Sequence, residues 1–65
     1  MSYADYKLGL AITADYNDDD FYGLIQACMR LADTDNLHKL KMAFPDVYED
    51  LENRYWASGG KLPEE

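Results

Sequence analysis

The sequence contains few of the residues that stabilise small proteins through disulfides or metal sites, or that form catalytic sites. There is one cysteine, one histidine and two prolines among 65 residues. A single cysteine cannot form a disulfide within the chain, and one cysteine with one histidine cannot make a structural zinc site. A chain this short hides only about 60% of its unfolded surface. We therefore expect a single small domain over residues 1–65, with a thin core and with self-association as a source of stability.

Basic residues are scarce as well. Six Lys and Arg stand against thirteen Asp and Glu, so the formal net charge is −7 at pH 7. Phosphate groups and anionic membranes are bound by clustered Lys and Arg, which argues against direct binding to DNA, RNA or a membrane. No apolar run approaches about 18 residues, and no basic segment precedes an apolar one at the N-terminus. The sequence therefore predicts a soluble, cytoplasmic protein.

The clearest predicted helix follows the acidic run at residues 17–20. Side-chain oxygens there can cap free backbone N–H groups, and we expect Asp18 to be the N-cap. Residues spaced by three and four then form one apolar stripe: Phe21, Leu24, Ile25, Cys28, Leu31 and Ala32. Because Cys28 lies on this stripe, we expect its thiol to be buried and inert.

Two further helices are predicted to meet at a corner. The segment 34–36 indicates a break before a short helix from Leu37 to Phe44, supported by an ion pair between Asp35 and Lys39. Pro45 disfavours helical backbone at Phe44 and is well tolerated in the first turn of a helix. The sequence therefore predicts a bend at Phe44-Pro45.

The last helix is expected from about Pro45 to Ala57, with Asp50 paired to Arg54. Gly59 offers the left-handed conformation that ends many helices, and Leu62 can fold back on the last turn. Tyr55 and Trp56 are about 100° apart on a helix, so we expect one of them to face outward.

Residues 1–16 carry two patterns. Helical spacing is kept by Tyr3, Tyr6, Leu10 and Ala14, whereas Leu8, Leu10 and Ile12 alternate as in a strand. A lone strand would have no partner in a chain whose other apolar segments are helical. We expect a helix, and hence an all-α fold with a small bundle of three to four short helices.

The residue combinations that form metal sites and catalytic sites are incomplete in this sequence. Asp15, Asn17 and Asp19 match the first three ligand positions of an EF-hand loop, but Asp20 stands where glycine is needed and Gln26 where the bidentate Glu is needed. His38 has no neighbouring Ser or Cys nucleophile. We therefore expect no catalytic residues, no metal site and no cofactor, and we do not expect an enzyme.

Aromatic residues and charge are both unevenly placed. There are six Tyr, two Phe and one Trp, and exposed Tyr and Trp are favoured anchors of binding interfaces. Residues 1–20 sum to −4 and residues 44–58 to −3, whereas residues 36–43 carry +2. Acidic faces with interleaved aromatics fit a partner with a basic surface. The alternative is that the acidic surface only maintains solubility. The aromatic residues would then only enlarge a small hydrophobic core.

The stretch from Ala43 to Leu51, continuing to Arg54-Tyr55 and Gly59-Gly60, reads AFPDVYEDL…RY…GG. Over residues 21–62 the chain resembles a group of very short uncharacterised phage and prophage proteins, in which AFPE, VW, EEL, RY and a glycine pair follow one another. Here Tyr48 stands in place of Trp, and Trp56 follows the RY pair. The resemblance implies a small phage accessory protein acting in the host-cell cytoplasm, a class in which stoichiometric inhibitors of host defence are common.

Two functions of different classes remain. The first is a protein that inhibits a host defence nuclease, or another nucleic-acid-binding protein, by docking on its basic surface. Its predicted contact residues are Asp18, Asp19, Asp20, Tyr22, Asp46, Tyr48, Glu49, Asp50 and Trp56. The alternative is a homo-oligomeric sponge that sequesters a nucleotide-derived signal, such as a cyclic dinucleotide, between subunits. Its predicted ligand-binding residues are Arg30, His38, Lys39, Lys41, Arg54 and Tyr55.

Overall fold

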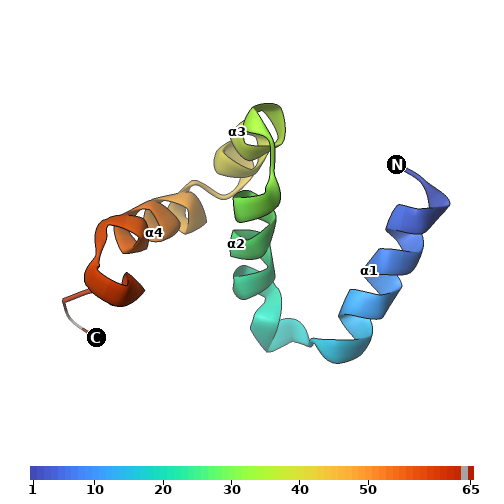
Figure 1. The fold of residues 1–65 in the computed structure, drawn as a ribbon, viewed down its shortest axis with the longest axis horizontal. Coiled ribbons are helices and arrows are strands. Elements are labelled where there is room, and N and C mark those ends of the chain that lie inside the picture. Colours follow the sequence, from blue (N-terminus) through green and yellow to red (C-terminus); the bar gives the residue numbers. More distant parts are fainter. Residues whose placement is uncertain (64) are drawn as a thin grey trace.

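Four helices and two short 3-10 turns make up the structure, a computed structural model that describes residues 1–63 and 65. In chain order they are α1 (Tyr3–Asp15), η1 (Asp18–Asp20), α2 (Phe21–Leu31), α3 (Thr34–Ala43), α4 (Pro45–Trp56) and η2 (Ser58–Gly60). The described residues contain no strand, so the predicted all-α class is confirmed. α2 stands between α1 and α4, and α3 covers the end of α2 far from α1 (Figure 1). None of these helices is long and apolar enough to cross a bilayer.

The first helix forms as predicted but stands apart. Ser2 caps α1 through a capping box, because its hydroxyl accepts from the Asp5 N–H at 3.3 Å and the Asp5 carboxylate accepts from the Ser2 N–H at 3.0 Å. Every residue of α1 is exposed, and α1 packs against none of the other helices. A helix of 13 residues is marginal in water without such packing.

The turn between α1 and α2 is capped by Asn17, so the prediction of Asp18 as N-cap is wrong. The Asn17 side chain accepts from the Asp19 N–H at 2.9 Å, and the Asp20 carboxylate accepts from the Asn17 N–H at 2.9 Å. This reciprocal pair begins a 3-10 turn one residue earlier than expected, which places Asp18 inside the turn. The acidic residues that were predicted to begin the helix therefore form a separate 3-10 turn before α2.

The buried face of α2 is only partly the predicted one, because Leu24, Ile25 and Ala32 are half-buried while Phe21, Cys28 and Leu31 are exposed. Met29 (3% exposed) and Val47 (7%) are the buried apolar residues, whereas Leu31 is 87% exposed and Cys28 is also exposed. α4 packs against the side of α2 that carries Tyr22 and Gln26. The expectation of a buried Cys28 thiol is therefore wrong.

α3 begins at Thr34, three residues before the predicted start. The Asp33 carboxylate caps it by accepting from the Asn36 N–H at 2.8 Å. The segment predicted as a break is thus the first turn of the helix. The predicted ion pair between Asp35 and Lys39 is not formed, since both ion pairs among the described residues involve Arg54.

The predicted bend at Phe44-Pro45 is confirmed. Phe44 leaves the helical region with φ −133° and ψ 65°, and Pro45 is the first residue of α4. The Phe44 ring lies 6.0 Å from that of Phe21 in an edge-to-face arrangement. This contact and the corner together bring α4 back beside α2.

A hydrogen-bonded clamp at Arg54 ties the C-terminal residues to α4. Its guanidinium donates to the Asp50 carboxylate at 3.0 Å, as predicted, and also to the Gly60 carbonyl at 2.9 Å and the Glu65 carboxylate at 2.7 Å. Gly59 (φ 63°) and Gly60 (φ 73°) both adopt the left-handed conformation that lets the chain turn back, which confirms the prediction for Gly59.

The clamp predicts a measurable shift in acidity at Glu65. Hydrogen bonds from Arg54, and then from the Leu62 N–H, lower the pKa of this carboxyl from 4.5 to about 2. The hydrogen bonds that Arg54 makes to Glu65 and, second, to Asp50 raise the pKa of Arg54. Because the folded-state pKa of Glu65 is depressed, its contribution to stability is present above pH 4.5 and is lost as the pH falls toward about 2.

We expect the Arg54→Gln variant to move the pKa of Glu65 from about 2 back toward 4.5. Carboxyl carbon shifts followed by NMR between about pH 1.5 and 6 report this titration directly. Arg30→Gln is the matched control, because Arg30 is exposed in the last turn of α2. A Glu65 midpoint near 4.5 in the unaltered protein would contradict the clamp.

Candidate functional site

A tyrosine of α2 stands between acidic residues of two other segments. Tyr22 lines a hollow of about 210 Å³ between α2 and α4 with Gln26, Asp46, Val47 and Asp50. The structure thus brings together three of the residues predicted for protein binding, Tyr22, Asp46 and Asp50. Tyr22 remains 61% exposed, so its ring is available for contact from outside.

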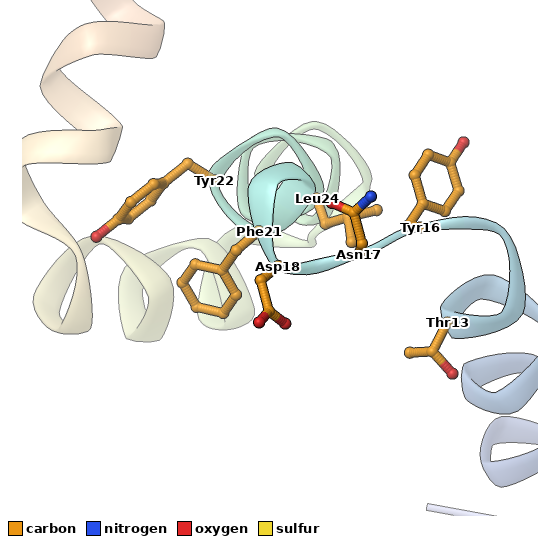
Figure 2. Close-up of a pocket in the computed structure, with 7 residues that line it drawn as sticks. All are labelled: Thr13, Tyr16, Asn17, Asp18, Phe21, Tyr22 and Leu24. Carbon is orange, nitrogen blue, oxygen red and sulfur yellow. The ribbon is translucent and has the colours of Figure 1, made fainter.

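The same tyrosine also borders the corner between α1 and α2. A second hollow, of about 600 Å³, is lined there by Thr13, Tyr16, Asn17, Asp18, Phe21, Tyr22 and Leu24 (Figure 2). Figure 2 shows Tyr22 on the opposite side of α2 from Thr13 and Tyr16. Tyr22 therefore borders one hollow with Asp18 of η1 and the other with Asp46 and Asp50 of α4. We call these four residues the acidic–tyrosine surface.

Hydrogen bonds fix one part of this surface. Asp50 accepts from the Gln26 side-chain amide at 2.9 Å and from Arg54 at 3.0 Å, and it is half-buried. These bonds hold its carboxylate beside the Tyr22 hollow. Asp18 and Asp46 are exposed, so their full charge faces solvent.

The remaining residues predicted for protein binding lie elsewhere. Asp19 and Asp20 line a hollow on another side of the corner, and Glu49 is exposed on α4. Tyr48 is half-buried beneath the Lys41 ammonium, which lies 4.7 Å from its ring centroid. These residues do not join the acidic–tyrosine surface.

Trp56 and Tyr55 both face solvent, which corrects the expectation that only one of them would. They are 79% and 77% exposed, and their rings lie edge to face with centroids 5.1 Å apart. The adjoining half-buried position is taken by Arg54, whose clamp closes the end of α4. An exposed aromatic pair therefore marks this end of the molecule.

The residues predicted for nucleotide binding are dispersed. Arg30 lies in the last turn of α2, and His38 and Lys39 are exposed on α3. Lys41 and Arg54 already have partners within the chain, namely the Tyr48 ring and the carboxylates of the clamp. Within residues 1–63 and 65 there is no group of three or more His, Cys, Asp or Glu side chains arranged to hold a metal ion.

Sequence reasoning missed the exposed apolar side of the molecule. Residues interpreted as core, among them Phe21, Cys28 and Leu31, lie at the surface of α2, and all of α1 is exposed. The signal that could have revealed this is the distribution of apolar residues in α1, where Leu8 and Leu10 lie on opposite sides of the helix, which is typical of a helix with more than one neighbour.

Comparisons with models of known protein families, with curated proteins and with solved structures find no match for this chain. The resemblance to short phage proteins therefore stays a prediction from the sequence.

Proposed function

We propose that this protein acts by stoichiometric binding, with the acidic–tyrosine surface docked on a basic surface of a partner protein. The observation that supports this most strongly is the placement of Tyr22. It is exposed, it borders two hollows, and the residues lining those hollows include Asp18, Asp46 and Asp50 but no Lys or Arg.

The chemistry of this surface fits a cationic partner. The Tyr22 ring offers apolar area that a Lys or Arg side chain can stack on, and its hydroxyl offers a hydrogen bond. The exposed Asp18 and Asp46 carboxylates supply acceptors for Arg and Lys, whereas Asp50 is already bonded to Gln26 and Arg54. The net charge of −7 accelerates association with a basic protein.

The kind of partner follows from the same chemistry. Extended basic surfaces belong mainly to proteins that bind nucleic acid, and an acidic protein seated there competes with the phosphate backbone. Together with the phage resemblance, this favours a host defence nuclease, or another nucleic-acid-binding protein, as the inhibited partner.

Binding should be strongly salt dependent. A partner captured from host-cell extract at about 50 mM NaCl and then purified should bind at least about tenfold more weakly at about 300 mM, because exposed charges are screened. Kd and association rate would be measured by surface plasmon resonance over this range, and inhibition of nucleic-acid binding would be measured in parallel.

Variants assign the effect to the surface. Asp46→Asn should slow association, and Tyr22→Ala should weaken binding by about 2 kcal/mol. Glu52→Gln removes the same charge from an exposed position on α4 outside the surface and is the matched control. Salt-independent binding, or an equal loss in Glu52→Gln and Asp46→Asn, would contradict the proposal.

The nucleotide sponge is the weaker candidate. Arg54 and Lys41 are engaged within the chain, and Lys39 lines a hollow at α2 and α3 without another residue of the predicted ligand set. A phosphate ligand would have to displace these contacts.

A further inference from the structure

Two stripes with the same spacing run along α1 and α2, and all of their residues are exposed except the half-buried Leu24. The α1 stripe and the α2 stripe both follow the 0, 3, 7, 10 offsets of paired helices. The α1 stripe is Tyr3, Tyr6, Leu10 and Thr13, and the α2 stripe is Phe21, Leu24, Cys28 and Leu31. Neither stripe contains a charged residue, although 29% of the chain is charged.

The stripes border the same space at the corner between their helices. Thr13 at the end of the α1 stripe lines the 600 Å³ hollow together with Phe21 and Leu24 at the start of the α2 stripe (Figure 2). Farther along α2, Cys28 and Leu31 line a hollow of about 430 Å³ that continues toward α3. The α2 stripe thus borders a hollow at each end, with Leu24 half-buried between them.

The chain exposes more surface than a compact protein of its size. Its accessible surface is 5656 Å², whereas a compact chain of this mass exposes about 4,200 Å². The radius of gyration is 13.6 Å, compared with about 11 Å for a compact domain of this length. The excess, about 1,400 Å² per chain, exceeds the roughly 800 Å² that each partner buries in a standard interface.

We propose that a second copy of this chain covers both stripes. α1 of each copy packs between α1 and α2 of the other, which gives a two-fold symmetric bundle of four helices. A second copy fits because it supplies a stripe of the same length and spacing, and because a symmetric contact closes after two chains. About 2,800 Å² in total would be buried, within the range of obligate homodimers.

Charge supports this arrangement over a contact through another face. Each copy carries −7, so association is favoured where charges are absent, and the stripes are uncharged. Asp46 and Asp50 line the separate hollow between α2 and α4 and stay accessible in the dimer. Asp18 and Tyr22 border the hollow at the α1–α2 corner, so they lie at the rim of the dimer contact. The inference therefore does not rest on the proposed function.

Sedimentation equilibrium and far-UV circular dichroism of the full chain test the dimer between about 1 and 200 μM. We expect a reversible monomer–dimer equilibrium, with helical signal rising as dimer forms, because α1 is marginal alone. Leu10→Asp should raise the dissociation constant at least about 100-fold. Leu8→Asp, on the opposite side of α1, makes the same substitution and should change it less than about threefold.

A second variant keeps the test independent of the fold of α1. Leu31 is 87% exposed at the end of the α2 stripe, so Leu31→Asp leaves the packing within one chain intact and should also dissociate the dimer. A monomer at 200 μM, a larger closed assembly, or equal effects of Leu8→Asp and Leu10→Asp would overturn the proposal. A dimer that Leu31→Asp leaves intact would also overturn it.

Discussion

Replacing Met29 with alanine is expected to lower the free energy of unfolding by about 2–4 kcal/mol, through lost burial and the cavity left behind. Met29 is 3% exposed, and Val47 is the other buried apolar residue of the described chain. A domain of this size has a stability of only about 5 kcal/mol or less. Most of that stability would be lost in the variant, so a substantial fraction of Met29→Ala chains should be unfolded at 25 °C.

Urea unfolding followed by circular dichroism measures this loss, at one fixed chain concentration for all variants. Met42→Ala makes the same substitution at a methionine that is 70% exposed on α3. Its effect should stay within about 0.5 kcal/mol. Equal destabilisation by the two substitutions would contradict the assignment of Met29 to the core.

Introducing aspartate at Val47 should be at least as damaging, with a loss of about 3 kcal/mol or more. The position is 7% exposed, and burying an unpaired carboxylate is unfavourable. Asp46 and Asp50 line the same hollow as Val47, so a third carboxylate there also adds repulsion. We expect α4 to detach from α2 and the helical signal to fall at neutral pH.

Tyr55→Asp is the matched control for this change. It adds the same negative charge to the same helix at a residue that is 77% exposed. Thermal unfolding at pH 7 and near pH 4 separates burial from charge, because protonation of the new carboxyl should restore part of the stability of Val47→Asp. A Val47→Asp variant with unchanged stability at pH 7 would show that α4 is not held through this residue.

Local signals in the sequence were sufficient for the helices and for their ends at proline and glycine. Pro45 restricts the backbone at Phe44, and Gly59 and Gly60 tolerate a positive φ without strain. The restriction by Pro45 and the freedom of the two glycines act within a few residues, so neither requires knowledge of the tertiary fold. The ion pair between Asp50 and Arg54 was predictable for the same reason.

The caps were harder to predict because several neighbours are chemically equivalent. Asn17, Asp18, Asp19 and Asp20 can all accept from a helix N–H. Asn17 takes that role because a 3-10 turn intervenes before α2. Similarly, Asp33 caps α3 at a point where the residues that follow it had indicated a loop.

The buried face of α2 could not be chosen from periodicity alone. One stripe contains Leu24, Cys28 and Leu31, and another contains Ile25 and Met29, and both satisfy helical spacing. The choice depends on where α4 docks, which is a tertiary matter settled by Val47 and by the hydrogen bond from Gln26 to Asp50. The acidic–tyrosine surface depends on the same docking. Its members were therefore predicted individually, but their grouping around Tyr22 was not.

The pattern of contacts between helices also bears on the kinetics of folding. α2, α3 and α4 are consecutive in the chain, and they pack with one another while α1 stays outside the group. Such low contact order is typical of chains that fold in microseconds to milliseconds. Ordering of this three-helix unit should therefore be a rapid, unimolecular event. Consolidation of α1 by a second chain would be a bimolecular phase whose rate rises with protein concentration.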